Sequence, residues 1–297
     1  MAKERETAES AGGAPPLPPG LHFVATPIGA ARDITLRALD ILKGADLLAA
    51  EDTRRARKLL DLHGVKLAGR KLISYHDHSG SGARKALLEA ARDGAVVAYV
   101  SDAGTPLVAD PGFALAREAI AAGAPVFAAP GASAVLAALV VSGLPSDRFL
   151  FAGFAPRSGR KAWLKAQLAC RATLILYESP KRVHRILAEM AEVAGQDVEM
   201  ALCRELTKRH EEVLRGPISQ VVDNIAGRDL KGEVVLVLGP VAPAEVSDAQ
   251  IETEVGEVIG EMGVKAAASF VSDQLGVPRR RVYQLALGLA SRNGDAS

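Results

Sequence analysis

The chain has 297 residues, 48% of them hydrophobic and 24% charged, which is ordinary for a globular protein of about two domains and excludes disorder as its main state. Its 36 basic and 35 acidic residues nearly cancel, so a nucleic-acid-binding surface would have to be a local one. The two cysteines, Cys170 and Cys203, are too few for a disulfide framework or a cysteine-rich metal site, and they favour a reducing compartment.

Residues 1–20 mix charges with glycine and proline and contain no apolar run, so we predict a disordered or extended tail rather than a signal peptide. Residues 124–144 carry no charge, and about 20 apolar residues suffice to cross a bilayer. However, Pro125, Pro130 and Gly131 interrupt this stretch. We therefore expect a short buried helix, no membrane segment and a cytoplasmic protein.

Residues 21–145 alternate strand-like and helix-like segments and are predicted to form a first α/β domain. The run 95–100 is almost entirely apolar, which is typical of a central strand buried on both faces. Asp33 and Asp110 are expected to cap the helices that follow them, because aspartate accepts hydrogen bonds from the first amides of a helix. The predicted strands cover 21–25, 46–50, 72–76, 95–100 and 125–129, and the helices 34–43, 54–60, 84–92, 111–122 and 133–142.

A second α/β domain is predicted over residues 146–240 and a helical segment over 241–297. In the last segment, two amphipathic stretches, 264–275 and 279–289, are joined by Gly276-Val277-Pro278. This spacing resembles that of a helix-turn-helix, although a plain helical hairpin packed on the body is the favoured interpretation. The predicted strands of the second domain cover 149–154, 172–177, 198–204 and 233–238, and its helices 161–169, 182–194 and 217–226.

Three loops follow predicted strands of the first domain, at residues 25–30, 101–112 and 129–134. Ligands of open α/β sheets bind outside the carboxyl ends of the strands, and Gly104 would let the backbone approach a ligand closely. The alternative is a set of tight turns without a ligand. The chain contains neither GxGxxG nor GxxxxGK[ST], which makes an ordinary dinucleotide fold and a P-loop NTPase unlikely interpretations.

Several polar clusters follow other strands. His76 and His78 would share one face of an extended segment, but a metal site needs three or more ligands and no partner cluster is evident. Glu178 is a candidate general base, with an ion pair at a helix start as the alternative. The basic residues of helix 54–60 would suit RNA phosphates, or would simply be solvated.

Eight short motifs occur in a fixed order: Ala25-Thr26-Pro27-Ile28-Gly29 with Asp33-Ile34-Thr35, Ala50-Glu51-Asp52-Thr53-Arg54, Tyr75-His76-Asp77-His78, Ser101-Asp102-Ala103-Gly104-Thr105-Pro106, Gly143-Leu144-Pro145-Ser146-Asp147-Arg148-Phe149, Tyr177-Glu178-Ser179, Arg204-Glu205-Leu206-Thr207-Lys208 and Gly232-Glu233. Together they resemble the ribosomal RNA small subunit methyltransferase I family, of the tetrapyrrole methylase class. The match runs over about residues 21–238, and the C-terminal helices are also similar to the family's. Small departures occur at Ala30-Ala31-Arg32, at Tyr75 and in the turn 130–134.

The resemblance implies two α/β domains of the tetrapyrrole methylase type with an S-adenosylmethionine cleft between them, and a homodimer. It implies 2′-O-methylation of a cytidine in the decoding region of 16S ribosomal RNA, on free RNA or within the small ribosomal subunit, without a metal. One alternative is a precorrin-type tetrapyrrole C-methyltransferase, which the motifs at 51–54 and 75–78 disfavour. Others are a non-catalytic RNA-binding protein on the same fold, which the intact cofactor loops disfavour, and a helix-turn-helix regulator, which leaves both α/β domains unexplained.

The resemblance and the strand-end positions together assign site residues. The catalytic candidates, in order, are Glu178, Asp102 and His76. The cofactor-binding candidates are Pro27, Asp102, Ala103, Gly104, Thr105, Pro106, Val108, Ser133, Ala134, Tyr177, Cys203 and Glu205. The substrate-binding candidates are Glu51, Arg54, His78, Lys181, Arg182, Arg204 and Lys208.

Overall fold

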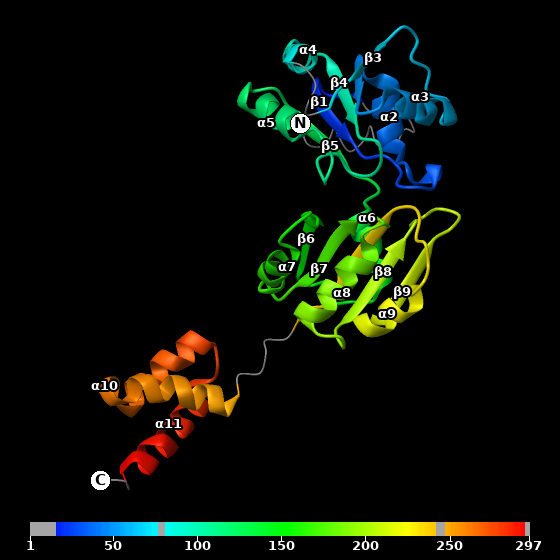
Figure 1. Cartoon of the computed structure of the whole chain (residues 1–297). Helices are drawn as coiled ribbons and strands as arrows, with labels where there is room; N and C mark the ends of the chain where they lie inside the picture. Colours follow the sequence, from blue (N-terminus) through cyan, green and yellow to red (C-terminus); the bar gives the residue numbers. More distant parts are fainter. Residues whose placement is uncertain (1–15, 77–80, 242–246, 295–297) are drawn as a thin grey trace, which may run out of the picture. The chain divides into compact units, whose positions relative to one another are not determined.

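A computed structural model of the chain describes residues 16–76, 81–241 and 247–294 (Figure 1). The chain divides into two compact units between Pro240 and Val241. No helix within the described ranges is long and apolar enough to span a bilayer.

The first sheet consists of five parallel strands in the order β3-β2-β4-β1-β5. Its central strand β4 is buried at every position, as the uniformly apolar sequence predicts. Helices α2 and α3 cover one face and α4 and α5 the other (Figure 1). The elements are β1 (Gly20–Val24), α2 (Leu36–Gly44), β2 (Leu47–Ala50), α3 (Thr53–Leu62), β3 (Lys71–Ser74), α4 (Ser81–Arg92), β4 (Val96–Val100), α5 (Phe113–Ala121) and β5 (Val126–Ala129).

The predictions that Asp33 and Asp110 cap helices are wrong. Asp33 lies in the 3-10 turn η1 (Ala31–Asp33), and Thr35 caps α2 by accepting a hydrogen bond from the amide of Ala38 at 3.1 Å. Helix α5 begins only after Gly112, whose φ of 119° is left-handed. The loop before α5 is therefore longer than expected, and it leaves Asp110 outside the helix.

Residues 1–15 of the expected tail lie outside the described residues, and residues 16–20 differ from a disordered tail. Leu17 packs against the core beneath α2, and His22 forms a hydrogen bond through Nε2 to the carbonyl of Pro18 at 2.8 Å. Hydrophobic burial of one leucine thus orders the residues immediately before the first strand.

The second sheet is mixed, in the order β6-β7-β10-β8-β9, and only β6 and β7 are parallel. Helix α6 packs against one face, and α7, α8 and α9 lie together on the other (Figure 1). The elements are α6 (Ala134–Ser142), β6 (Phe149–Phe154), α7 (Arg160–Leu168), β7 (Thr173–Glu178), α8 (Val183–Ala194), β8 (Glu199–Arg204), β9 (Glu212–Pro217), α9 (Ile218–Ile225) and β10 (Val234–Leu238).

Two features of this sheet differ from the predictions. The expected boundary near residue 145 assigns α6 to the first domain, whereas α6 contacts strands β7, β8, β9 and β10. Strand β9 has no predicted counterpart, because its sequence Glu212–Pro217 is polar and ends in Gly-Pro. Such sequences are tolerated at a sheet edge, where one side of the strand needs no partner.

The C-terminal unit consists of α10 (Asp248–Leu275) and α11 (Arg279–Gly294). Helix α10 is interrupted at Gly263, whose φ of 73° and ψ of 161° are not helical. Its second half and α11 occupy the two predicted amphipathic stretches, with Gly276 in the left-handed conformation between them. The unit has its own small core of Ile251, Val255, Ala267, Ala268, Val271, Val282 and Ala286.

Candidate functional site

Hydrogen bonds join the three predicted ligand loops at the carboxyl edge of the first sheet. The amide of Thr26 donates to the carbonyl of Gly104 at 2.9 Å, and the amide of Gly104 donates back at 3.0 Å. The hydroxyl of Thr105 donates to the carbonyl of Ala132 at 3.1 Å. Gly104 has a φ of 82°, a conformation that few other residues adopt without strain. The loops therefore form one connected edge, as expected from parallel strands.

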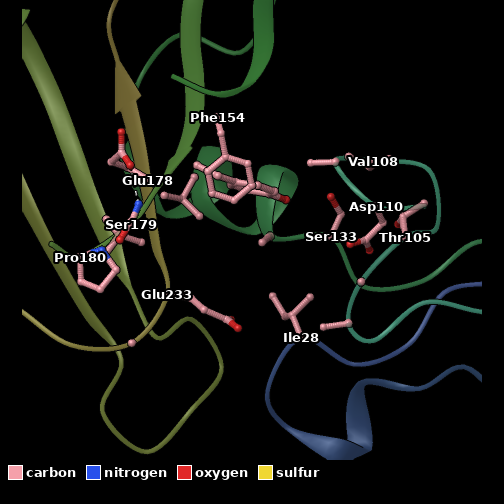
Figure 2. A pocket seen from close by; sticks show the side chains of 18 residues that line it. Ile28, Thr105, Val108, Asp110, Ser133, Phe154, Glu178, Ser179, Pro180 and Glu233 are labelled. Atoms are coloured by element: carbon pink, nitrogen blue, oxygen red, sulfur yellow. Dashed lines mark hydrogen bonds between the residues drawn. The ribbon is translucent and has the colours of Figure 1, made fainter. Parts of the chain in front are cut away.

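These loops and the second sheet enclose a cavity of about 380 Å³ (Figure 2), within the size range of small-molecule sites. The second sheet contributes the ends of β6 and β7 and the segment leading into β10. The lining residues are Ile28, Ala103, Gly104, Thr105, Val108, Ala109, Asp110, Ser133, Ala134, Phe154, Tyr177, Glu178, Ser179, Pro180, Gly232, Glu233, Val234 and Val235.

The lining is apolar and acidic. Phe154 and Tyr177 meet edge to face with ring centroids 5.5 Å apart, and Asp110, Glu178 and Glu233 are its charged residues. Among the residues that the structure describes, no lysine, arginine or histidine lines the cavity, and no group of three potential ligands could hold a metal ion. The cavity thus carries negative charge beside an aromatic surface.

Asp110 is the lining residue whose electrostatics are most altered. Burial raises its pKa to about 6, the nearby carboxylates of Glu51, Asp102 and Glu233 add to the rise, and a hydrogen bond from Ser101 opposes it. In Figure 2 its side chain lies beside Thr105 and Ser133, on the wall contributed by the first sheet. Carboxylates with strongly raised pKa values are concentrated at functional sites.

Two comparisons show which proteins share this architecture. Residues 20–222 match the family model of tetrapyrrole (corrin/porphyrin) methylases, and residues 245–290 match that of the RsmI C-terminal HTH domain. The ribosomal RNA small subunit methyltransferase I of Mesorhizobium japonicum is 44% identical over 283 residues, covering 94% of this chain and 95% of the relative. The chain belongs to the ribosomal RNA small subunit methyltransferase I family.

Other relatives and solved structures agree with this placement. The family member from Mycobacterium tuberculosis is 41% identical over 266 residues, which cover 89% of this chain and 93% of the relative. Diphthine synthase superposes with a TM-score of 0.57 at 21% identity, covering 74% of this chain and 89% of its own. Uroporphyrin-III-C-methyltransferase from Thermus thermophilus superposes with a TM-score of 0.53 at 23% sequence identity, covering 74% of this chain and 94% of its own. The predicted α/β fold of the tetrapyrrole methylase type, with a helix-turn-helix-like C-terminal segment, is confirmed.

Seven of the predicted cofactor residues of this family member line the cavity, and the side chain of Cys203 does not. The lining ones are Ala103, Gly104, Thr105, Val108, Ser133, Ala134 and Tyr177. Cys203 is fully buried in the core between α6 and the second sheet, where burial raises the pKa of its thiol to about 12. Since β8 alternates its side chains between faces, Cys203 points into packing rather than to a ligand.

The remaining predicted cofactor residues support the cavity from outside its lining. Pro27 and Pro106 flank the hydrogen-bonded pair of loops. Glu205 accepts a hydrogen bond from the amide of Glu233 at 2.9 Å and pairs with Lys208 at 2.8 Å, so it holds the segment that carries Glu233.

The predicted general base Glu178 has a buried, ion-paired carboxylate. Its side chain is 0% exposed and its Oε1 accepts from Nε of Arg182 at 2.6 Å and from the amide of Ser179 at 2.6 Å. In Figure 2 the carboxylate of Glu178 turns away from Asp110 and Thr105. The ion pair at a helix start, which was the alternative interpretation, is present with Arg182, and Oε2 of Glu178 is buried without a hydrogen-bond partner among the described residues.

The other two catalytic candidates do not line the cavity. Asp102 joins the ends of β2 and β4: it accepts from the amide of Asp52 at 3.0 Å and pairs with Arg55 at 3.2 Å. His76 is an exposed residue that follows β3. Its predicted partner His78 lies outside the described residues.

The predicted substrate residues that the structure describes lie outside the cavity lining, and most of them form ion pairs. Arg54 is 91% exposed and pairs with Asp52 at 3.2 Å, Arg204 pairs with Glu212 at 3.0 Å, and Lys208 pairs with Glu233 at 2.9 Å. Lys181 is exposed at the end of β7. Glu51 is half-buried, and burial and Asp102 raise its pKa.

Sequence reasoning missed Asp110 and assigned no role to Glu233. Asp110 resembled a helix cap because Pro111 follows it, and proline is favoured in a first helical turn. The sequence nevertheless contained a signal against a helix beginning at Pro111, because the next residue, Gly112, disfavours helix. The loop conformation and the nearness of three other carboxylates decide the role of Asp110, and both are tertiary properties.

Proposed function

We propose that this chain transfers a methyl group from S-adenosylmethionine to the ribose 2′-oxygen of a cytidine in 16S ribosomal RNA. The charge of the cavity carries the proposal: three carboxylates line it and, within the described residues, no cationic side chain does. S-adenosylmethionine bears a sulfonium and an ammonium against one carboxylate and therefore suits such a cavity. A phosphate-bearing cofactor would be repelled by it.

The lining also suits the uncharged parts of this cofactor. The rings of Phe154 and Tyr177 would contact adenine or the sulfonium, since aromatic faces attract cations. The backbone of residues 103–105 would meet the polar groups of the ligand, as proposed from the sequence. When bound, the cofactor supplies an electrophilic methyl group.

The chain's own contribution is proposed to be positioning. None of Glu178, Asp102 and His76 extends a side chain from the lining toward a reacting group, since Glu178 is paired and turned away and the other two lie outside the lining. Holding two reactants in line is worth about 7–11 kcal/mol in well-oriented systems. We therefore propose that the loops after β4 and β7 place the acceptor hydroxyl rather than deprotonate it.

The RNA substrate is supported by the names of the relatives, which are ribosomal RNA small subunit methyltransferases. Arg54, Lys181 and Arg204 are proposed to contact RNA phosphates, and the assembled small subunit in the cytoplasm is the proposed setting. Because the net charge is only +1, such contacts must come from these local groups, and they would weaken as salt rises.

A homodimer is part of the proposal and is supported by α6. This helix is apolar on all sides, yet Leu136 is 53% and Val140 81% exposed. A helix that is apolar all round is normally buried, so we propose that a second copy covers this side. Val140→Glu should shift the protein to monomer in light scattering, whereas a dimer unaffected by this change would place the interface elsewhere.

Methyl transfer from labelled S-adenosylmethionine tests the proposed reaction. Small ribosomal subunits, naked 16S RNA and a tetrapyrrole would be offered in parallel, and labelled RNA would be mapped by its resistance to cleavage at the modified ribose. Label on a cytidine ribose supports the proposal and identifies the assembly state recognised. Label on the tetrapyrrole alone would contradict it and favour C-methylation.

A further inference from the structure

The three carboxylates of the cavity differ in the cations that balance them. Glu178 pairs with Arg182 at 2.6 Å, and Glu233 pairs with Lys208 at 2.9 Å. Within the part of the chain that the structure describes, Asp110 has no ion pair. The charged groups that raise its pKa most strongly are Glu51, Asp102 and Glu233, all of which are acidic. Asp110 is thus a carboxylate surrounded by like charge.

The backbone holds Asp110 in this unfavourable place. Leu107 and Ala109 adopt left-handed φ values of 72° and 58°, a conformation that residues with a side chain rarely adopt. Gly112 has a φ of 119°, which residues with a side chain rarely adopt, and an added Cβ would be crowded at 3.2 Å from Leu107, Phe23 and Tyr99. The loop therefore fixes Asp110 beside the cavity rather than letting it turn into water.

A half-buried carboxylate that no protein cation balances is stabilised when a cationic ligand arrives. We propose that Asp110 is the counter-ion of the positively charged methyl donor and is a specificity residue of the cofactor site. This inference rests on the proposed function, because it takes S-adenosylmethionine to be the ligand. Glu233, which is 73% exposed and balanced by Lys208, is assigned no such role.

The test compares binding of S-adenosylmethionine and S-adenosylhomocysteine to the full-length chain by calorimetry. Asp110→Asn keeps the size of the side chain and removes its charge. We expect it to weaken S-adenosylmethionine binding about tenfold or more, which corresponds to roughly 1.4 kcal/mol. Glu233→Gln is the matched control within the cavity and should reduce the affinity for S-adenosylmethionine clearly less. Asp93→Asn, at an exposed position after α4, should change nothing.

The pattern of losses identifies which charge Asp110 balances. Loss of affinity for S-adenosylmethionine alone assigns Asp110 to the sulfonium, and an equal loss for both ligands assigns it to the ammonium that they share. Unchanged affinity of Asp110→Asn for both ligands would overturn the inference, and a lower turnover at that affinity would place Asp110 on the acceptor instead. If the unaltered chain binds neither ligand, the proposed function itself fails. A thermal melt verifies that each variant is folded.

Discussion

Two of the segments that bring carboxylates to the cavity differ in how they balance the charge. At the end of β7, Glu178 is completely buried and is balanced by Arg182 at 2.6 Å. The loop after β4 leaves Asp110 half-buried among acidic groups that raise its pKa to about 6. The difference indicates that a buried charge with a partner inside the protein contributes to the stability of the fold. A charge without such a partner lowers that stability, and binding of a cationic ligand would offset the loss.

Removing the partner of Glu178 should have the largest effect. Arg182→Met leaves a fully buried carboxylate unpaired, which typically costs about 3 kcal/mol or more, measured as the free energy of unfolding in urea. The double variant Glu178→Gln/Arg182→Met should recover part of that loss. If Glu178 were a general base instead, Glu178→Gln would abolish turnover and leave stability unchanged.

The second-largest effect is expected in the pH dependence of cofactor binding. The carboxylate of Asp110 is ionised well above its pKa of about 6 and protonated well below it. The carboxylates of Glu51, Asp102 and Glu233 interact electrostatically with it, and so does the Tyr177 hydroxyl. Affinity for S-adenosylmethionine should therefore fall by about tenfold between pH 7.5 and pH 5. Asp110→Asn should lack most of this change, and an equally steep profile in that variant would exclude Asp110 as its source.

Stability should move in the opposite direction to binding. Because the pKa of Asp110 is raised on folding, its ionisation favours the unfolded chain, so stability is lost as pH rises through about 4 to 6. Asp110→Asn should be more stable than the unaltered chain at pH 7.5, by about 1 kcal/mol after allowing for partial exposure. The difference in the free energy of unfolding between the two proteins should disappear near pH 4, and urea titrations at both pH values measure it.

A smaller structural effect is expected at the turn that begins the β4 loop. Gly104→Ala places a side chain at a φ of 82°, with its Cβ 3.4 Å from Ile28, and should cost about 1 kcal/mol. Because Gly104 lines the cavity, cofactor affinity should fall as well. Gly123→Ala is the matched control, since its φ of 73° is similar but nothing lies within 4 Å of the added carbon. It should lose stability without losing affinity.

The smallest effect is expected at Arg54, which is 91% exposed. Arg54→Ala should leave the thermal melt unchanged because exposed ion pairs contribute little. It should reduce the salt dependence of RNA binding by about one phosphate contact, measured as the slope of affinity against salt concentration. An unchanged slope would exclude Arg54 from the RNA-binding surface.

Much of the fold could be predicted because hydrophobic periodicity reports burial locally. The run at residues 95–100 predicted a central strand, and β4 occupies that place. The amphipathic stretches around Gly276 predicted the C-terminal helices, which form there. Strand β9 escaped prediction because an edge strand needs little apolar sequence. Helix α6 was expected with the first sheet because periodicity does not say which surface covers a buried helix.

The sequence by itself determined the alternation of strands and helices, the three glycine-containing loops at one sheet edge and the family to which the chain belongs. These depend on local pattern and on ordered motifs, both of which are readable along the chain. Only the tertiary structure decided that Glu233 is balanced and that Asp110 is not, because Lys208 and the acidic neighbours Glu51 and Glu233 of Asp110 come from other strand ends. Charge balance in a cavity is a sum over groups distant in sequence, and the folded chain alone brings them together.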